Sequence, residues 1–374
     1  MGMQVHGRAM SHCRGLPPAR MATRTDPTIP VCQEKMPSIG FKPRQPAQGK
    51  THMSVVLLHQ NIQHMDEDLI ARLKAAAQPR ELIVSTDPTE YMDRVEDVEI
   101  IAGHPSSEVL FAAENCRWVQ IFSAGADALL MKHPEARDMD FQLTNVSGIH
   151  AISITEHIFS LLLTLARSIH VSIRAQADRD WVKHEHADVQ EVAGTTMCLI
   201  GVGSIGSRVA RTAHAMGMTV LGVRRHKGLD IPQGIAEVFG PDQLGEAMGR
   251  ADWVVCCAPH TPGTHELVQE EHFRAMQPHA HFINIGRGKV VVEPALVRAL
   301  QEGWIKGAGL DVTYEEPLPA DSPLWDMGNV IVTSHYSGQS ESYGERATEV
   351  LLDNLVRFNE GRPLNNLVDK KLGY

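Results

Sequence analysis

A glycine-rich run in the middle of the chain has the spacing of a phosphate-binding turn. The segment 197–200 is apolar and too short for a buried helix, and it is followed by Gly201, Gly203 and Gly206 in G-x-G-x-x-G spacing. Small apolar residues at helical spacing come next, so the run predicts a strand, a tight turn and a helix. In such a turn the backbone N–H groups at the helix start face a pyrophosphate. The flanking strand and helix favour dinucleotide binding over a merely tight turn.

Two arginines stand where NAD-binding turns carry an acidic residue. That residue lies about 20 positions beyond the glycines, at the end of the next strand, and accepts hydrogen bonds from the ribose 2′-OH. Here a predicted strand at 218–223 is followed by Arg224 and Arg225, and no carboxylate comes before Asp230. Guanidinium groups suit a 2′-phosphate because they offer planar, bidentate donors. We therefore expect the cofactor to be NADP(H), with NAD(H) as the alternative. The two arginines are also explained without any cofactor, as a basic turn exposed to solvent.

Three further polar residues follow predicted strands of the C-terminal half, on the side where a parallel sheet binds ligands. They are Arg287, Glu316 and His335. These residue types can hold an anion, orient a neighbour and transfer a proton. Taken singly, they are equally well explained as a surface arginine, a helix-flanking glutamate and a loop histidine. A functional interpretation depends on their occurring together.

Strands and helices alternate along the chain, which predicts α/β architecture with parallel, doubly wound sheets. A helix over about 152–170 carries apolar residues on nearly every face, so we expect it to be buried all round, between domains or in a dimer interface. In a first unit over about 53–145 the pattern predicts strands at 54–58, 81–84, 98–102, 118–122 and 141–145, with helices at 66–77 and 109–114. Beyond the glycine turn it predicts strands at 253–258, 281–285, 307–312 and 330–333, with helices at 242–248, 293–302 and 342–360.

Composition sets the broad class of the protein. The 374 residues are 43% hydrophobic and 21% charged, which fits a soluble globular protein of two domains. The net charge of −10 argues against a nucleic acid or an anionic membrane as the main partner. Six scattered cysteines suit a reducing compartment, so we expect a cytoplasmic protein with inert core thiols and no metal site.

The first 52 residues lack the sequence pattern of a folded domain. They carry eight Lys and Arg, two acidic residues and seven prolines, without sustained periodicity. A transit peptide is one interpretation, but the prolines interrupt any amphipathic helix. We expect a disordered extension or an upstream start codon.

Taken together and in this order, the motifs resemble the D-isomer-specific 2-hydroxyacid dehydrogenase family, in its glyoxylate and hydroxypyruvate reductase branch. The resemblance covers most of 53–365 and is specific for the family, not for the substrate. The matching stretches are Ser123-Ala-Gly-Ala-Asp127, Thr144-Asn-Val-Ser-Gly148, the glycine turn, Pro259-His-Thr-Pro-Gly-Thr264, and the segments around Arg287, Glu316 and His335.

The resemblance implies a Rossmann dinucleotide domain at 149–338, inserted into a flavodoxin-like substrate domain at 53–148 and 339–374. It also implies an oxidoreductase, most simply a homodimer, that reduces a 2-oxo acid to the D-2-hydroxy acid or runs the reverse reaction. Arg287 would hold the substrate carboxylate and polarise the ketone. His335 would protonate the ketone oxygen, and Glu316 would favour the charged imidazole and orient it.

The same resemblance implies the binding residues. Backbone N–H groups at Ala124, Gly125 and Ala126, with Arg287 and His335, would bind the substrate. Asp311 would accept a hydrogen bond from the nicotinamide carboxamide. The cofactor set is Gly201, Gly203, Ser204, Ile205, Gly206, Arg224, Arg225, Ala258, Pro259, Thr264, Ile285, Gly286, Arg287, Asp311, His335 and Gly338.

Two departures from the family pattern and two rival functions stay open. Tyr336 follows His335 where the family often has small residues, so it narrows or alters the pocket. Arg224 replaces the acidic ribose-binding residue, which puts NAD in doubt. One rival is a dinucleotide-sensing interaction protein of the corepressor type on the same fold; the other is a formate or phosphonate dehydrogenase. A 2-oxo acid fits best, because its reduction needs the proton that His335 supplies and formate oxidation does not.

Overall fold

The computed structural model describes residues 53–59, 67–226, 228 and 230–373. The extension expected over 1–52 lies outside the described residues.

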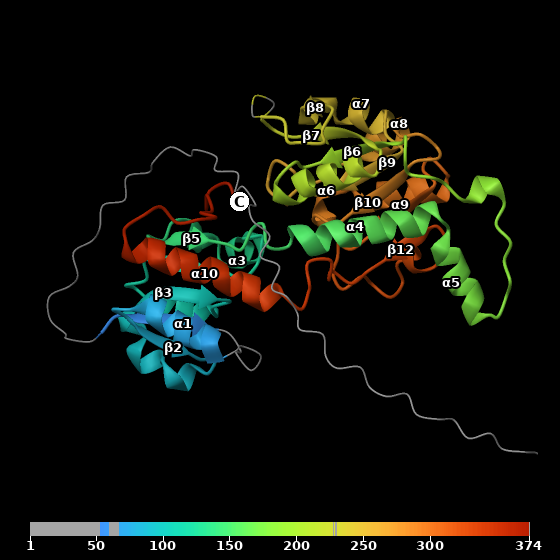
Figure 1. The fold of residues 1–374 in the computed structure, drawn as a ribbon. Coiled ribbons are helices and arrows are strands. Elements are labelled where there is room, and N and C mark those ends of the chain that lie inside the picture. The colour runs from blue at the N-terminus through green and yellow to red at the C-terminus, as the bar shows by residue number, and fades with distance from the viewer. Residues whose placement is uncertain (1–52, 60–66, 227, 229, 374) are drawn as a thin grey trace, which may run out of the picture. The chain divides into compact units, whose positions relative to one another are not determined.

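Within that part of the chain, five parallel strands form a first sheet in the order β2-β1-β3-β4-β5 (Figure 1). This is the strand order of flavodoxin-like sheets. Successive residues of β1 bury opposite faces: Val56 and Leu58 pack beneath α1 and α10, whereas Val55 and Leu57 pack beneath α2 and α3. The last helix therefore returns to the first sheet. The elements are β1 (Val55–His59), α1 (Glu67–Ala77), β2 (Glu81–Val84), β3 (Val98–Gly103), α2 (Ser107–Ala112), β4 (Trp118–Gln120), α3 (Asp127–Lys132), β5 (Gln142–Thr144) and α10 (Tyr343–Asn359).

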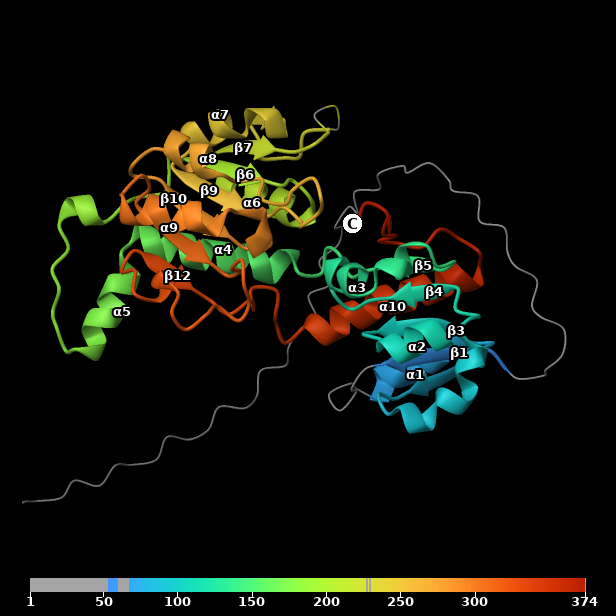
Figure 2. The ribbon, with the colours of Figure 1, turned by 180° about the vertical axis from the view of Figure 1, so that it is seen from behind.

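Seven parallel strands of the described chain form a second sheet, in the order β12-β11-β10-β9-β6-β7-β8. The order reverses between β6 and β9, as in dinucleotide-binding sheets, and ligands bind at that switch point. Helices α4 and α6 cover one face, and α7, α8 and α9 cover the other (Figure 2). The elements are α4 (Ala151–Ala166), α5 (Ile169–Ala177), β6 (Thr196–Ile200), α6 (Ser204–Ala215), β7 (Thr219–Val223), β8 (Glu237–Phe239), α7 (Leu244–Gly249), β9 (Trp253–Cys256), α8 (Glu270–Ala275), β10 (His281–Asn284), α9 (Glu293–Gln301), β11 (Gly307–Leu310) and β12 (Val330–Val332).

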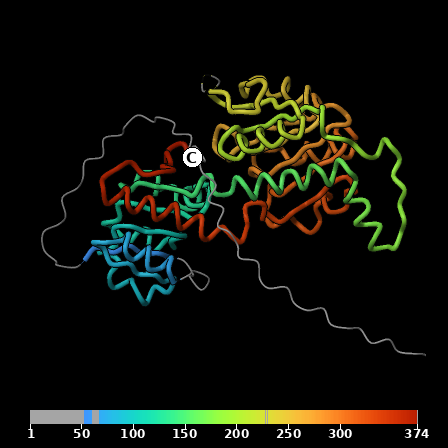
Figure 3. The backbone as a smooth tube through the Cα atoms, viewed as in Figure 1, coloured from blue at the N-terminus to red at the C-terminus, as the bar shows by residue number. Residues whose placement is uncertain are grey.

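The apolar helix expected over 152–170 is broken in the structure. Helix α4 ends at Ala166, Ser168 adopts left-handed backbone angles (φ 51°), and α5 leaves at 75° (Figure 3). The Ser168 hydroxyl donates to the carbonyl of Asp188 and the Gln190 N–H donates to that of Ala166, so the returning segment satisfies the helix end.

The single chain leaves part of this helix exposed, and its burial in a dimer interface stays a prediction. Leu163 is 36% exposed on the outer face of α4. Among the described residues, no single helix is long and apolar enough to span a membrane; α4 and α5 pass a test of length and composition only as a bent pair.

A buried histidine lies at the start of β10. The ring of His281 is stacked on that of Trp253 with 4.6 Å between centroids, and only 3% of the residue is exposed. Burial lowers the pKa of His281 to about 3, and nearby Lys306, His170 and His279 act in the same direction. The folded protein therefore holds this ring neutral, whereas an unfolded chain would protonate it below about pH 6.5.

Replacing His281 with Leu should make the protein less sensitive to acid. Because the folded-state pKa is depressed, the unfolded chain binds the extra proton, and stability falls as the pH drops from about 6.5 towards 3. At pH 5 the loss from this one group is about 2 kcal/mol. The free energy of unfolding, measured with urea at pH 7.5 and at pH 5, should differ less between the two pH values in His281→Leu than in wild type. Replacing the exposed His214 with Leu is the control. If wild type and His281→Leu lost the same stability between pH 7.5 and pH 5, His281 would not be the group responsible.

Candidate active site

The glycine turn joins β6 to α6 and packs against the end of β9. Gly201 has left-handed backbone angles (φ 95°), and a Cβ added there would lie 2.9 Å from the Ala258 nitrogen. A Cβ on Gly206 would overlap the carbonyl of Gly201, so α6 approaches the turn as closely as backbone allows. Both glycines are therefore required by packing.

Gly203 has a different reason to be glycine. No described heavy atom lies within 4 Å of a Cβ built on it, so packing does not require its small size. Ser204 begins α6 directly after it, and Ile205 packs at the edge of the core beneath α4. Open space in front of a glycine at a helix N-terminus fits the pyrophosphate of a dinucleotide.

Arg224 and Arg225 leave the sheet beside this turn. Ile200 and Val223 are register partners, and the Gly201 N–H donates to the carbonyl of Val223 (2.9 Å). The Arg224 guanidinium donates to the backbone carbonyl of Asp230 (3.0 Å). That of Arg225 lies close to Gly263, 3.4 Å from where a Cβ would stand. The position that an acidic ribose ligand would occupy thus carries two cations.

The ends of β9 and β10 complete the cofactor side of the site. Ala258 lies between the two turns, because a Cβ on Gly286 would be only 2.6 Å from the Ala258 carbonyl. The Thr264 hydroxyl donates to the Pro259 carbonyl (2.6 Å) and accepts from the Thr261 N–H (2.8 Å), which braces the 259–264 loop. Ile285 is buried beneath α4. The structure brings these expected residues to one sheet edge; their contacts with a cofactor stay predictions.

Arg287 follows β10 and is held by its own turn. The side-chain amide of Asn284 donates to the Arg287 carbonyl (3.3 Å), and its oxygen accepts from the Gly286 N–H (3.1 Å). A Cβ on Gly288 would overlap the carbonyl of Thr313, so this turn lies directly on the turn after β11.

The Arg287 guanidinium reaches the loop after β4. Its Nε and Nη2 donate to the carboxylate of Asp127 (3.1 and 3.2 Å), and its Nη1 donates to the Gly286 carbonyl (2.9 Å). The expected substrate loop, Ala124 to Ala126, immediately precedes Asp127. Burial disfavours the charged carboxylate, but the hydrogen bonds and charge of Arg287 outweigh it, so the pKa of Asp127 is lowered.

His335 and Glu316 form the second half of the site. The His335 Nδ1 lies 2.7 Å from Glu316 Oε2, and the other carboxylate oxygen of Glu316 accepts from the Thr313 N–H (3.2 Å). A neutral or charged His335 that donates through Nδ1 presents Nε2 to solvent, since the side chain is 46% exposed. Thr313 therefore links the Glu316–His335 pair to the turn of Arg287.

Asp311 holds the loop that carries His335. It is 1% exposed, and its Oδ1 accepts from the Thr333 hydroxyl (2.6 Å) and the Tyr336 N–H (3.2 Å), while Oδ2 accepts from the Ser337 N–H (3.1 Å). Burial opposes ionisation, but hydrogen bonds from Ser337 and Thr333 prevail, and the pKa of Asp311 is lowered. Both carboxylate oxygens of Asp311 accept hydrogen bonds from this loop, so its contact with a nicotinamide carboxamide stays a prediction.

The end of this loop is joined to α4. The Gly338 carbonyl accepts from the Ser153 hydroxyl (3.2 Å) and lies 3.1 Å from Nδ1 of His150. Tyr336 is 45% exposed, with its ring packed edge-on against that of His157 (5.2 Å). Part of the Tyr336 ring therefore remains available to shape a pocket.

Asp127, Thr333 and His157 belong to the site, although their residue types and spacing assign them no role. His157 Nε2 lies 3.0 Å from the Thr333 hydroxyl and 3.6 Å from Asp311. Burial lowers the pKa of His157 despite the charge of Asp311, which favours the neutral ring. The one available signal was Asp127 itself, an acidic residue closing the small-residue loop.

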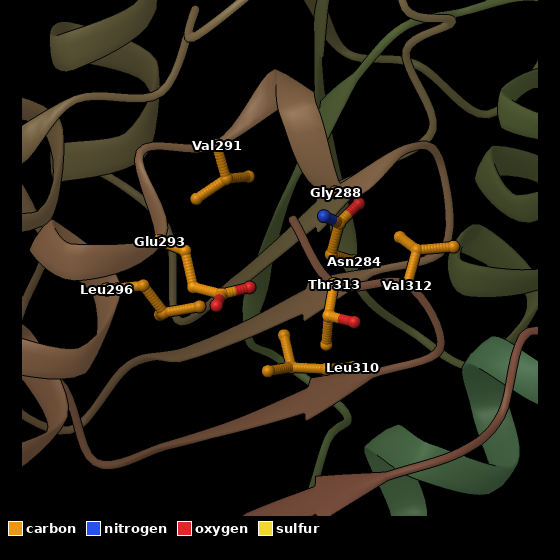
Figure 4. A pocket seen from close by; sticks show the side chains of 8 residues that line it. All are labelled: Asn284, Gly288, Val291, Glu293, Leu296, Leu310, Val312 and Thr313. Carbon is orange, nitrogen blue, oxygen red and sulfur yellow. The ribbon is translucent and has the colours of Figure 1, made fainter. Parts of the chain in front are cut away.

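A small cavity lies behind the Arg287 turn, between the ends of β10 and β11 and the start of α9. It includes no residue of the glycine turn and so is a packing gap rather than a cofactor site. Figure 4 shows its lining: Asn284, Gly288, Val291, Glu293, Leu296, Leu310, Val312 and Thr313.

Other chemistry is limited in the described part of the chain. It contains no group of three or more His, Cys, Asp or Glu side chains able to hold a metal ion. Its four cysteines are free, and burial raises the pKa of Cys198 to about 12 and that of Cys256 to about 11. Such thiols are inert at neutral pH.

Comparison with known proteins yields matches along most of the chain. The family model for the NAD binding domain of D-isomer specific 2-hydroxyacid dehydrogenases matches residues 159–337. A glyoxylate reductase of Korarchaeum cryptofilum (strain OPF8) is 32% identical over 288 residues, covering 75% of this chain and 86% of the relative.

Solved structures give the same result. A D-isomer specific 2-hydroxyacid dehydrogenase family protein from Aeromonas salmonicida is 33% identical with a TM-score of 0.73, covering 85% of this chain and 100% of that one. An NADPH-dependent glyoxylate/hydroxypyruvate reductase from Sinorhizobium meliloti, solved with NADP and sulfate, is 27% identical with a TM-score of 0.72, covering 86% and 100%.

Proposed function

The chain belongs to the D-isomer specific 2-hydroxyacid dehydrogenase family and is an NAD(P)-dependent oxidoreductase of 2-oxo and 2-hydroxy acids, and on this premise we propose its specific reaction. It reduces a small 2-oxo acid to the D-2-hydroxy acid with NADPH, using Arg287, Glu316 and His335. The observation that carries the proposal is the 2.7 Å contact between His335 and Glu316, joined through Thr313 to the turn of Arg287.

The substrate carboxylate binds between Arg287 and the backbone N–H groups of Ala124, Gly125 and Ala126. A guanidinium beside free N–H groups suits a carboxylate, and the same N–H donors polarise the adjacent ketone oxygen. The position of Asp127, directly after this loop and paired with Arg287, supports the assignment.

His335 holds the transferred proton on Nε2. Glu316 accepts a hydrogen bond from Nδ1–H and so fixes the ring and its tautomer, leaving Nε2–H to protonate the ketone oxygen. The bound nicotinamide supplies the hydride. In the reverse direction neutral His335 takes the hydroxyl proton at the same atom.

NADPH is the preferred cofactor in this proposal. The glycine turn receives the pyrophosphate, and Arg224 and Arg225 receive the 2′-phosphate, because they leave the sheet beside Gly201. A relative solved with NADP supports the assignment. Residues 149–338 then form the dinucleotide domain, and 53–148 with 339–374 the substrate domain. Free, buried thiols support a cytoplasmic location.

A homodimer completes the proposal. Trp181 is 88% exposed, and Ile169 and Ile173 on α5 are 43% and 59% exposed. Exposed apolar side chains repeated along the segment 169–181 are typical of an interaction surface, and a second copy is the partner proposed here.

Replacing His335 with Ala should abolish most of the turnover while leaving the cofactor bound. General acid–base groups contribute about 10²–10⁴-fold to a rate, so kcat should fall by at least about a hundredfold. A panel of glyoxylate, hydroxypyruvate and phenylpyruvate with NADPH gives the rates, and NADPH fluorescence gives cofactor binding. Near wild-type turnover of every 2-oxo acid that wild type reduces would contradict the role of His335. If wild type bound NADPH but reduced none of the three 2-oxo acids, the result would instead favour the dinucleotide-sensing interaction protein.

Replacing Arg224 and Arg225 together with Ser should weaken NADPH selectively. The loss of two phosphate-binding cations should raise the KM for NADPH about 10–100-fold, with the KM for NADH nearly unchanged. Arg362→Ser, which removes an exposed arginine paired with Glu360, is the matched control. A wild-type preference for NADH, or parallel changes for both cofactors, would overturn the assignment.

Light scattering should give twice the mass of the chain at micromolar concentration. Replacing Ile173 and Trp181 with Ser should shift the protein towards the monomer, because both side chains would leave an apolar interface. A wild-type monomer under these conditions would rule out the dimer.

A further inference from the structure

We propose that Asp127 is a positioning residue for Arg287: it fixes the plane of the guanidinium so that the outer N–H pair faces the substrate carboxylate. The inference rests on the proposed function, because it assigns Arg287 to substrate binding. The Asp127–Arg287 contact determines specificity, a role that Arg287, Glu316 and His335 do not have by themselves.

The hydrogen bonds of Arg287 leave a defined pair of donors. A guanidinium has five N–H groups. Nε and Nη2 each give one to Asp127, and Nη1 gives one to the Gly286 carbonyl. Among contacts of the described residues, one N–H on Nη1 and one on Nη2 remain. Nη1 and Nη2 form the outer edge of the guanidinium, which is the edge that binds a carboxylate end-on.

Without Asp127, the guanidinium would lose two of its three anchors. The Arg287 side chain is 32% exposed, so surrounding packing does not fix it. A bidentate carboxylate on the Nε edge restricts both the last torsion angles and the tilt of the plane. Asp127 is the first residue of α3, so the helix fixes the backbone from which its carboxylate extends.

Gly125 provides an independent sign that the ion pair has a reserved position. A Cβ on Gly125 would overlap both Asp127 Oδ1 and Arg287 Nη2. The paired side chains thus lie directly against the loop whose N–H groups face the substrate. The atoms in the way are side-chain ends, so a methyl group there would displace the ion pair without forcing the backbone apart.

The charge of Asp127 also matters for its role. It is ionised at neutral pH because Arg287 holds it so, and the pair is neutral before substrate arrives. A substrate carboxylate is then bound by the direction of the guanidinium hydrogen bonds rather than by attraction to an unpaired positive charge. This arrangement favours planar carboxylates over other anions of equal charge.

The test replaces Asp127 with Asn, which keeps the shape but puts an amide nitrogen where one acceptor oxygen stood. Asp138→Asn is the matched control, since Asp138 is 76% exposed and paired with Lys371. We expect Asp127→Asn to raise the KM of the 2-oxo acid, and the Ki of the unreactive analogue oxamate, at least about tenfold. The NADPH affinity and melting temperature should stay close to those of wild type, and the control should change none of the four values.

A second variant separates positioning from loss of charge. Asp127→Glu keeps the charge but moves the carboxylate by one methylene group, which displaces the ion pair, so it should raise KM and Ki in the same way. Unchanged KM and Ki in both variants would overturn the proposal. Lower values in Asp127→Asn would also overturn it, because they would mean that Asp127 competes with the substrate for the guanidinium. Failure of the proposed function is distinguishable, since wild type with NADPH would then neither reduce a 2-oxo acid nor bind oxamate.

Discussion

The buried carboxylate of Asp311 determines where the His335 ring lies. It accepts from the Thr333 hydroxyl and from the N–H groups of Tyr336 and Ser337, on both sides of His335. Unpaired, such a carboxylate would be costly to bury, so the loop must close around it to satisfy its oxygens. His335 is thereby held with left-handed backbone angles (φ 52°), an unusual conformation for a residue with a Cβ. Its ring then meets Glu316.

From this loop a continuous set of contacts runs to the substrate side of the site. Glu316 is fixed by the N–H of Thr313, and the Thr313 carbonyl lies where Gly288 has no Cβ. Arg287 precedes Gly288 and reaches Asp127 at the start of α3, which packs on the first sheet. Parallel strands make this possible, because β10, β11 and β12 release their loops at the same edge. A side chain at Gly288 would therefore displace Arg287 as well as the turn.

Much of the architecture could be predicted from local patterns. The alternation of short apolar strands with helices identified both sheets, and the structure confirms the family's two parallel α/β units. The turn after α4 was missed because its cause is distant: Ser168 and Ala166 are satisfied by residues 188 and 190, which no helical periodicity reveals. Strand β8 was missed because Glu237–Phe239 is too short to show alternation and depends on pairing with β7.

The site divides in the same way. Arg287, Glu316 and His335 could be located because each follows a strand end, and their order matched a known family. The contacts that orient them could not, since Asp127 and Arg287 lie 160 positions apart and His157 and Thr333 lie 176 apart. Such pairs are set by strand order, which only the assembled sheets determine. A motif thus identifies the proposed reacting groups, whereas the hydrogen bonds that support them are seen only in the folded structure.

The most direct measurement of the central claim is a crystal structure of the protein with NADPH and oxamate. The account predicts that the oxamate carboxylate lies on the outer N–H pair of Arg287 and the N–H groups of the 124–126 loop, with Asp127 still paired to Arg287. The adjacent carbonyl oxygen of oxamate should lie within hydrogen-bond distance of His335 Nε2. Oxamate bound away from Arg287, or with its carbonyl oxygen out of reach of His335, would contradict the account.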